Sequence, residues 1–446
     1  MQIPDHARDV VERLERYGYE AYVVGGCVRD SLLGREPKDW DVCTSALPEE
    51  VLRVFRRFHV IKTGLQHGTL TVMSEHRPVE VTTFRTDGSY SDGRHPDSVS
   101  FVPRIEEDLA RRDFTINAMA YNPARGLIDL YGGQDDLRAG LIRCVGEPDA
   151  RFHEDGLRLL RALRFAARYG FAPERETGYA LRRNRHLLEH ISAERIFSEL
   201  RGILEGRDAL SMLLGFPELF TAIIPELEPC IGAPQNSPYH CYDVWTHSAH
   251  AVQAAPADII LRLTLLLHDI AKPACRSTDA AGIDHFHGHP EQGAQLAERI
   301  LRRLKSDNDT RRDVVTLIRE HDRALPQDLP AMRRLIGKLG LLNTQRLLEV
   351  QRADLAAHAP EHRESWTADL RRAQALLAEV QDEPPAFSVG DLAIGGRELM
   401  QLGLAPGPGI RRLLEQLLCE VQDEQLTNSP EALCTRARQL LTTPQA

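Results

Sequence analysis

The stretch GGCVRDSLLGREPKDWDV, from Gly25 to Val42, ends with two aspartates that are separated by one tryptophan. In a β-strand, residues at positions i and i+2 point to the same face of the sheet. If Asp39 and Asp41 lie on a strand, their carboxylates share one face and repel each other, so a positive group is expected between them. Trp40 would then point the other way and pack into the core.

Two glycines precede this acidic segment and change how it is interpreted. Gly25 and Gly26 end a predicted strand, EAYVVGG, and the residues CVRDSLLG that follow are typical of a helix. Backbone N–H groups at a helix N-terminus bind phosphate, and glycine lets the phosphate approach closely. Arg29 adds a guanidinium suited to phosphate. A DxD pair alone mostly indicates a solvated strand edge, and paired glycines alone indicate a turn, but the combination is far more specific.

Oxygen ligands at this position favour a hard cation. Mg²⁺ binds carboxylates and substrate phosphates, and two such ions can serve both the attacking and the leaving oxygen of a phosphoryl transfer. Glu80, in the segment VEVTTFR, lies on a predicted neighbouring strand and supplies a third acid. The sequence therefore predicts a magnesium site formed by Asp39 and Asp41, with Glu80 as a third catalytic acid.

The composition is that of a folded, non-membrane protein. The chain has 446 residues, a length that indicates two to four domains. Its formal net charge is −10. It contains no apolar run long enough to span a membrane and no secretion signal at its start, so a cytoplasmic location is expected. The eight cysteines are scattered without a CxxC pair, which is typical of reduced thiols.

The periodicity of apolar residues changes near residue 150. The first part of the chain mixes helix and strand patterns, whereas the rest shows helical spacing and no convincing strand. From Arg151 to Arg207 the chain has 12 arginines against 8 acids, which indicates either a basic surface or an ordinary solvated helical one. The polar, turn-rich stretch from Arg85 to Ser100 is expected to form a long loop, and such loops are usually functional or disordered.

Further motifs follow the acidic segment in a fixed order: RRDFTINAMAY (111–121), IDLYGG (128–133), EDGLRLLRALRF (154–165) and AERIFSEL (193–200). Together with the first stretch they resemble the motifs of the class II tRNA nucleotidyltransferases and their bacterial poly(A) polymerase relatives. The resemblance covers residues 1 to about 210, and the remainder resembles long bacterial members that carry an HD domain.

The resemblance implies an α+β fold. A polymerase-β-like nucleotidyltransferase head with a small mixed sheet would be followed by an elongated, all-helical neck, body and tail. The expected boundaries are 1–140 for the head, 141–215 for the neck with its base-selecting motif, 216–380 for the body with the HD domain, and 381–446 for the tail.

It also implies an activity and its partners. The enzyme would add CCA to the 3′ end of tRNA from CTP and ATP without a template and release pyrophosphate, with Mg²⁺ held by Asp39 and Asp41. A monomer or a homodimer is expected. The loop at 85–100 favours addition of CCA or of A alone, while a poly(A) polymerase and a CC-adding enzyme stay open as alternatives. The residues expected to bind the nucleotide are Gly25, Gly26, Arg29, Arg111, Arg112, Asn117, Asp155, Arg158, Arg161 and Arg164.

The chemistry of Asp155 and Arg158 agrees with base selection. In one helix these residues are i and i+3 and share a face. The carboxylate only accepts hydrogen bonds and the guanidinium only donates them, so the pair matches the amino group and ring acceptors of cytosine and adenine. Uracil and guanine would place a carbonyl against Asp155, and a buried mismatch of that kind is costly. The competing interpretation is a surface salt bridge between Glu154 and Arg158. For RRDFTIN, the alternative to phosphate binding is a helix start with Asp113 in the first turn.

A series of histidines and aspartates follows downstream. It resembles the HD phosphohydrolase pattern, with His247, His268, Asp269 and Asp354 as one metal set, and His289 and His321, with His287 nearby, as further candidates. Imidazole and carboxylate ligands suit one or two transition-metal ions such as Ni, Mn, Co or Zn. A working site would hydrolyse 2′,3′-cyclic phosphates or other phosphoesters. The alternatives are a protein that is mainly such a phosphohydrolase and only binds RNA, and a degenerate helical scaffold without metal.

Overall fold

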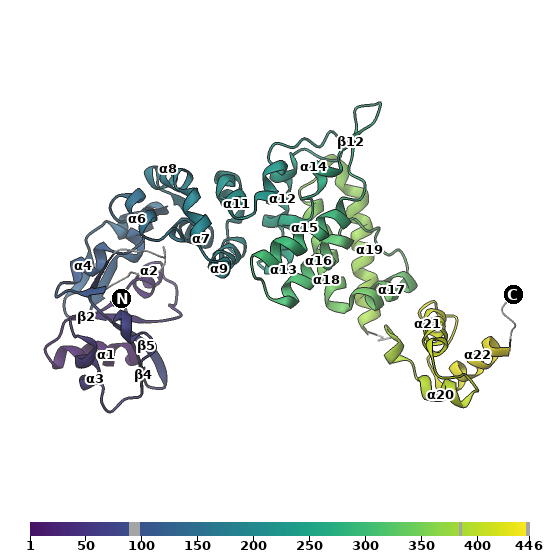
Figure 1. The fold of residues 1–446 in the computed structure, drawn as a ribbon, viewed down its shortest axis with the longest axis horizontal. Coiled ribbons are helices and arrows are strands. Elements are labelled where there is room, and N and C mark those ends of the chain that lie inside the picture. Colours follow the sequence, from purple (N-terminus) through teal and green to yellow (C-terminus); the bar gives the residue numbers. More distant parts are fainter. Residues whose placement is uncertain (89–98, 383–385, 443–446) are drawn as a thin grey trace. The chain divides into compact units, whose positions relative to one another are not determined.

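The computed structural model describes residues 1–88, 99–382 and 386–442. It divides the chain into two compact units, Met1–Pro225 and Glu226–Ala446, and each is described here by itself. Figure 1 shows the strands gathered in the first unit, whereas the second is built mainly of helices.

The strands of the first unit are β1 (Ala21–Val24), β2 (Asp41–Thr44), β3 (Val60–Ile61), β4 (Thr69–Ser74), β5 (Arg77–Thr83), β6 (Arg85–Asp87), β7 (Val99–Phe101), β8 (Met119–Asn122), β9 (Gly126–Asp129), β10 (Leu141–Ile142) and β11 (Ala172–Pro173). Its α-helices are α1 (Asp5–Arg16), α2 (Gly26–Leu32), α3 (Pro48–Val54), α4 (Ile105–Ala110), α5 (Gly133–Ala139), α6 (Pro148–Glu154), α7 (Arg158–Tyr169), α8 (Arg175–Arg183), α9 (Ala193–Leu204), α10 (Ala209–Gly215) and α11 (Pro217–Ile223). Short 3-10 helices are η1 (Leu65–His67), η2 (Thr115–Asn117) and η3 (Arg185–His190).

The main sheet of the first unit is mixed, as expected. Its strand order is β3-β4-β5-β2-β1-β8-β9. Strands β2 and β5 run parallel, while the other neighbours are antiparallel. Strands β2 and β5, the two expected to carry acids, are therefore direct neighbours, and their pairing places Asp41 beside Glu80.

Two helices cover the sheet, one on each face. Helix α1 carries Ala7, Val10, Val11 and Leu14 at helical spacing, all fully buried, and it packs against β1, β2, β4 and β5. On the other face, Ile105 and Leu109 of α4 pack with side chains of β1, β2 and β8. Because β1 is central, all four of its residues are buried. Helices α2, α3 and α5 lie between strands of the first part, and from α6 onward the unit is mainly helical, as the change in periodicity predicts.

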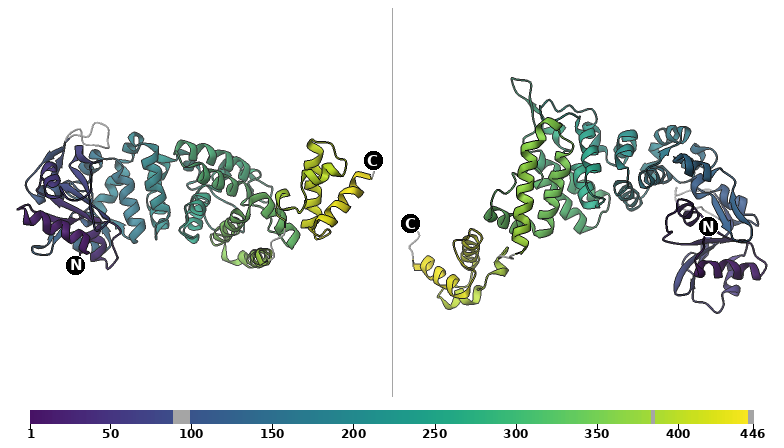
Figure 2. Two further views of the ribbon diagram at one scale, coloured as in Figure 1. Left: turned by 90° about the horizontal axis from the view of Figure 1, so that it is seen from below. Right: turned by 180° about the vertical axis from the view of Figure 1, so that it is seen from behind.

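The second unit contains α12 (Val244–Ala254), α13 (Ile259–Leu267), α14 (Lys272–Cys275), α15 (His289–Arg303), α16 (Asn308–Glu320), α17 (Leu329–Leu339), α18 (Leu341–Leu355), α19 (Arg363–Asp382), α20 (Gly396–Gln401), α21 (Pro408–Gln422) and α22 (Pro430–Thr442). Its short elements are η4 (Pro225–Cys230), which starts at the preceding unit's last residue, η5 (Pro360–His362), η6 (Val389–Asp391), β12 (Ser277–Thr278) and β13 (Asp284–His285). Figure 2 shows helices α12 to α19, teal to green, lying side by side. Within the described ranges, no helix combines the length and the apolar character that a membrane span requires.

Two expectations about local structure need correction. The absence of strands after residue 150 is wrong for β11, β12 and β13, each of which has two residues. Such short pairs carry no alternating pattern that a sequence could reveal. The stretch from Arg85 to Ser100 is not a loop throughout, because β6 and β7 at its ends pair antiparallel. Its middle, residues 89–98, lies outside the described residues, so the prediction about loop function stays a prediction.

Candidate active site and metal centre

Asp41 and Glu80 lie side by side on the parallel strands β2 and β5, where they are register partners. Asp41 is half-buried and Glu80 is exposed. Burial raises the pKa of Asp41 to about 6, with further increases from the charges of Glu80 and Asp39 and a decrease from Arg112. The carboxylates thus repel one another as the sequence predicts, and a cation placed among them would relieve that repulsion.

The expectation that both aspartates lie on the strand is wrong for Asp39. Strand β2 begins at Asp41, and Asp39 is an exposed residue before it. If the register is continued, Asp39 would face Pro78 on one side and Gly26 on the other. Pro78 has no N–H to donate, and Gly26 already begins α2, so the strand has no ladder partners there. Trp40 is 7% exposed, which confirms that it packs inward.

The glycine turn before α2 adopts the conformation that glycine permits. Gly25 has φ 76°, and a Cβ at this position would lie 2.9 Å from Nη1 of Arg112. Any other residue would be strained there and would push against that guanidinium. Arg112 and Arg111 both bind the fully buried Asp108, with Nη2 to carboxylate distances of 3.2 and 2.8 Å. This anchor holds Arg112 beside the glycine turn and fixes Arg111 on the same carboxylate.

The sequence predicts that Arg29 binds phosphate, but its side chain is buried. Its side chain is enclosed, 4% exposed, and its Nε donates to Asp30 Oδ1 at 2.9 Å. Its Nη1 donates to Oδ1 of Asn117, and its guanidinium lies 5.1 Å from the ring centre of Phe165 and 5.0 Å from that of Tyr169. The structure therefore brings Arg29 and Asn117 together, and it adds Asp30 and Tyr169 as partners that the sequence interpretation missed.

The expectation that Asp155 and Arg158 share one helix is wrong. Asp155 has extended backbone angles at the end of α6, and α7 begins only at Arg158. Oδ1 of Asp155 accepts a hydrogen bond from the backbone N–H of Leu157 at 3.0 Å, and Oδ2 accepts one from Arg195 at 2.9 Å. An Asp side chain that bonds to the backbone two residues on competes with the helix, which explains the break.

Arg158 is buried at the start of α7 and reaches two neighbouring segments. Its Nη1 donates to Glu154 at 2.5 Å, so the salt bridge offered as the alternative interpretation is present. The same Nη1 donates to the carbonyl of Arg151 at 3.2 Å, and Nη2 donates to the carbonyl of Arg111 at 3.2 Å. Arg158 thereby connects α7 to the segment that follows α4.

Two of the later arginines of α7, Arg161 and Arg164, are engaged by acids. Arg161 binds Asp113 through Nε at 3.0 Å and Nη2 at 2.7 Å, and Arg164 binds Glu199 at 2.5 Å. Although burial opposes ionisation, Arg161 and Asn117 hold the pKa of Asp113 well below its usual range. Asp113 precedes η2 and does not start an α-helix, so its role as an anchor was missed. The sequence signal was its position directly after the two arginines.

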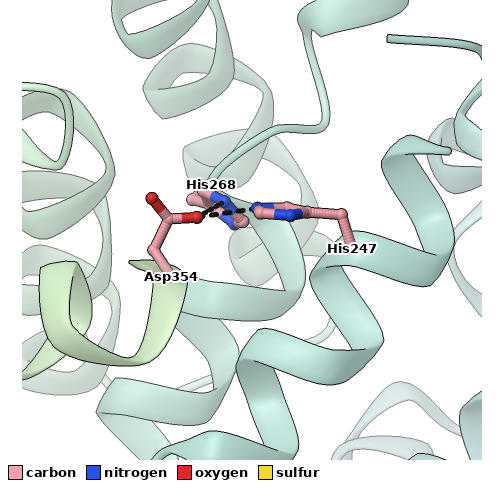
Figure 3. Close-up of side chains that lie close together, drawn as sticks. All are labelled: His247, His268 and Asp354. Carbon is pink, nitrogen blue, oxygen red and sulfur yellow. Dashed lines mark hydrogen bonds and ion pairs between the residues drawn. The ribbon is translucent and has the colours of Figure 1, made fainter. Parts of the chain in front are cut away.

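A second set of side chains converges in the second unit. His247 comes from α12, His268 and Asp269 follow α13, His289 begins α15, His321 follows α16 and Asp354 lies near the end of α18. Figure 3 shows His247 and His268 pointing toward Asp354. Nε2 of His247 lies 2.7 Å and Nε2 of His268 lies 3.2 Å from the same oxygen of Asp354. The predicted series is thus brought together from residues more than a hundred positions apart.

Asp269 lies at the centre of this cluster. Its Oδ2 is 3.2 Å from Nε2 of His268, while its Oδ1 is 3.4 Å from Nε2 of His289 and 3.7 Å from Nε2 of His321. Its carboxylate is 1% exposed, and the ammonium of Lys272 lies 2.7 Å from Oδ2. Two groups have ligand atoms mutually within 4.8 Å, namely His247 with His268 and Asp354, and His268 with Asp269 and His321.

The four imidazoles are oriented as metal ligands usually are. In each ring Nδ1 faces a backbone carbonyl, at 3.4 Å for His247, 2.8 Å for both His268 and His289, and 2.7 Å for His321. Because Nδ1 faces the carbonyl, Nε2 is directed into the cluster. Metal-binding histidines typically show the same arrangement and donate their other N–H to a carbonyl or carboxylate. His287 is exposed and stacks on His285, so it does not join the set.

Charge is concentrated in this cluster. Burial alone lowers the pKa of His268, but Asp269 and Asp354 outweigh it and raise that pKa to about 10. Burial also opposes the charge on Asp269, yet His268 and Lys272 hold its pKa well below the usual range. Without a metal, a proton on His268 therefore compensates the two acids. The sequence interpretation missed Lys272, whose signal was its position three residues after Asp269.

The cluster opens to solvent through a cavity of about 460 Å³. That volume lies within the ~300–1,000 Å³ of typical small-ligand sites. Tyr239 and Trp366, which are 44% and 38% exposed, also line it. His358 was likewise missed, and its ring centre lies 5.2 Å from that of His247.

Comparison with known sequences gives matches along most of the chain. Residues 21–143 match the family described as "Poly A polymerase head domain", and residues 170–231 match "Probable RNA and SrmB-binding site of polymerase A". Residues 289–437 match a family described as tRNA nucleotidyltransferase domain 2. A CCA-adding enzyme of Latilactobacillus sakei is 33% identical over 441 residues, 97% of both chains. A CCA-adding enzyme of Geobacillus thermodenitrificans is 50% identical over 207 residues, which is 46% of this chain and about half, 51%, of that relative.

Solved structures agree with the sequence matches. The crystal structure of the Bacillus stearothermophilus CCA-adding enzyme in complex with CTP superposes with a TM-score of 0.75 at 30% identity, covering 99% of this chain and 98% of that one. The Thermotoga maritima CCA-adding enzyme complexed with tRNA has the same fold, with a TM-score of 0.60 at 21% identity.

Proposed function

Because the chain belongs to the CCA-adding enzyme family and is a tRNA nucleotidyltransferase, we propose that it completes the 3′ end of tRNA with the residues described above. The 3′-hydroxyl of the tRNA attacks the α-phosphate of CTP or ATP, and pyrophosphate leaves. Adding two C residues and one A in succession yields the finished end. The observation that carries the residue assignment is the juxtaposition of Asp41 and Glu80 beside the glycine turn.

Asp39, Asp41 and Glu80 are the residues that hold the divalent cation. Burial and, after it, the charges of Glu80 and Asp39 raise the pKa of Asp41, and a bound cation would offset both effects. Mg²⁺ at this position would stabilise the charge that develops on the attacking and leaving oxygens. Arg111 and Arg112, fixed by Asp108, are placed to bind triphosphate oxygens near Gly25, where the absence of a side chain permits close approach.

Base selection belongs to the α6–α7 junction. Each oxygen of Asp155 accepts one hydrogen bond from the protein, and a carboxylate has capacity for about four. Asp155 can therefore still accept a bond from the amino group that cytosine and adenine share. Arg195 fixes the orientation of this carboxylate, and Arg158 is held against the head by its bond to Arg111. A fixed acceptor beside a fixed donor is the arrangement that discriminates against uracil and guanine.

A product-length assay tests this function. The protein is incubated with tRNA lacking its CCA end and with each labelled nucleotide, and the products are resolved at single-nucleotide length. A stop after CCA is expected. Long A tails on any RNA would instead indicate a poly(A) polymerase, and products ending at CC or limited to A would indicate the partial activities. Asp39→Asn with Asp41→Asn should abolish addition, whereas Asp135→Asn, an exposed acid on α5, serves as the matched control.

A second function is favoured by the geometry of the histidine cluster. Six predicted ligands, His247, His268, Asp269, His289, His321 and Asp354, meet at one place with every Nε2 directed inward. We propose that they hold one or two transition-metal ions such as Ni, Mn, Co or Zn, with Asp269 between the two groups. Such an ion would supply Lewis-acid activation of water for hydrolysis of 2′,3′-cyclic phosphates or other phosphoesters. Lys272 lies beside Asp269, and its ammonium, which also donates to Gln235 at 2.8 Å, offsets the charge of that carboxylate.

Metal analysis of the purified protein tests this second proposal. Bound transition metal and phosphoesterase activity are expected in the wild type, and both should be lost in His268→Ala. His287→Ala is the matched control for metal content, because that exposed ring lines the same cavity but stacks on His285 outside the ligand set. A metal-free protein whose phosphoesterase activity is unaffected by His268→Ala would leave the cluster as a helical scaffold.

A further inference from the structure

Helix α7 presents one continuous stripe to the head. Arg158, Arg161, Phe165 and Tyr169 are spaced by three or four residues and therefore lie on one side of the helix. Arg158 bonds to the carbonyl of Arg111, as described above, and the Phe165 ring packs edge-on against Phe114 at 5.8 Å. The helix that starts with the proposed base-reading arginine is thus fixed along its whole length.

Two further bonds of this stripe belong to one buried network. At one end Arg161 binds Asp113, and Asn117 donates to the other oxygen of Asp113 at 3.0 Å. At the other end the hydroxyl of Tyr169 donates to Oδ1 of Asp30 at 2.8 Å.

Arg29 joins the two ends. Its Nε donates to Asp30 and its Nη1 donates to Asn117. The bonds therefore run from Arg161 through Asp113, Asn117, Arg29 and Asp30 to Tyr169, and α7 itself closes the ring. Asp30 is 7% exposed and Tyr169 is 3% exposed, so both are enclosed by protein.

We propose that this buried ring positions the base-reading junction of Asp155 and Arg158 against the catalytic carboxylates, and that Asp30 and Tyr169 are positioning residues for base selection. The inference rests on the proposed function. Arg161 and Tyr169 are eight residues apart, which is about 12 Å along a helix that rises ~1.5 Å per residue. Two anchors at that separation fix the tilt of α7 as well as its position.

Selection between bases is sensitive to such placement. The difference between a cytosine amino group and a uracil carbonyl is read by one hydrogen bond, whose value depends on distance and angle. A displacement of ~1 Å in a reacting complex can cost on the order of a hundredfold in rate. A loosened α7 would lower the advantage of CTP over UTP more than it lowers the chemistry with any one nucleotide.

The variant Tyr169→Phe tests the inference with little risk to folding. It removes the hydroxyl that bonds to Asp30 and keeps the ring beneath Arg29. The measurement is kcat and KM for single additions to tRNA lacking its CCA end, with CTP and with UTP. We expect the ratio of the two kcat/KM values to fall about five- to tenfold, which corresponds to the net contribution of one ordinary hydrogen bond. Tyr179→Phe, whose exposed ring lies under Arg175 on α8, should leave the ratio unchanged.

A double-mutant cycle separates positioning from general destabilisation. Asp30→Ala should lower the ratio further than Tyr169→Phe does. Combining the two should add little, because the hydroxyl then has no partner left to lose. Equal losses with CTP and UTP in both variants, at an unchanged ratio, would show that the ring only stabilises the fold and would overturn the inference.

Asp155→Ala in the same assay distinguishes the inference from its premise. If Asp155→Ala loses selectivity while Tyr169→Phe and Asp30→Ala keep it, the positioning role is wrong and the proposed function stands. If Asp155→Ala keeps selectivity, base reading by this junction is wrong, and the positioning role fails with it.

Discussion

Asp41 is held in a charged form that its surroundings disfavour. Its pKa is about 6 in the folded chain against 3.8 for an ordinary aspartate. Between these values the folded state binds more protons than the unfolded state, so this group makes the protein less stable as pH rises from about 4 to 6. Above pH 6 the penalty is constant at roughly 3 kcal/mol. The charged Asp41 at the proposed metal site therefore lowers the stability of the metal-free protein.

Replacing Asp41 by asparagine is expected to stabilise the metal-free protein while it abolishes nucleotide addition. In EDTA at neutral pH the gain should be at most about 3 kcal/mol, which is ~5–10 °C in Tm for a unit of this size. Thermal unfolding followed by circular dichroism measures it. Mg²⁺ should raise the Tm of the wild type and not that of Asp41→Asn. A variant that melts below the wild type in EDTA would contradict the repulsion described here.

The same pKa predicts how metal binding depends on pH. Below about pH 6 a proton competes for Asp41, so Mg²⁺ affinity should fall by about tenfold per pH unit and level off above pH 6. Isothermal titration with MgCl₂ between pH 5 and 8 provides the measurement. A flat profile across this range would mean that Asp41 does not titrate on metal binding.

At the scale of elements, the sequence predicts the types of most segments but not where some of them end. The strand before the glycines and α2 follow from local patterns, whereas the mixed sheet follows from the resemblance to the nucleotidyltransferase family. The break between α6 and α7 does not, because the apolar spacing continues through it and a single bond from Asp155 to the backbone ends the helix. The start of β2 at Asp41 also depends on partners, Gly26 and Pro78, which only the sheet register identifies.

The candidate sites likewise contain some residues that the sequence predicts and others that it does not. The resemblance to the HD phosphohydrolase pattern predicts the six metal-ligand candidates from their order in the chain. The sequence does not predict Asp30, Tyr169 or Asp113, since their roles arise from contacts between segments that are far apart in the chain. Ordinary polar residues become informative only when burial shows that each must have a partner.

The convergence of five helices on one cluster leads to a prediction for metal content. His321→Ala should lower the bound transition metal and leave His247, His268 and Asp354 as a weaker group, because His321 follows α16 and serves the other group together with Asp269. Elemental analysis of protein purified without chelator gives the stoichiometry per chain. His287→Ala should retain the wild-type content. Equal metal content in His321→Ala and the wild type would exclude His321 as a ligand.

At the scale of the whole molecule, the two proposed sites lie in different compact units, Met1–Pro225 and Glu226–Ala446. A ligand that binds only the folded form of one unit stabilises that unit by ~2.7 kcal/mol at a concentration of a hundred times its Kd. For units of about this length the shift is roughly 5–10 °C. Calorimetry of the full chain should therefore show that CTP with Mg²⁺ raises one unfolding transition, and that a transition metal at the histidine cluster raises another. Asp41→Asn should remove the first response and keep the second, while His268→Ala should do the reverse. A single transition that both ligands shift together would contradict independent unfolding of the two units.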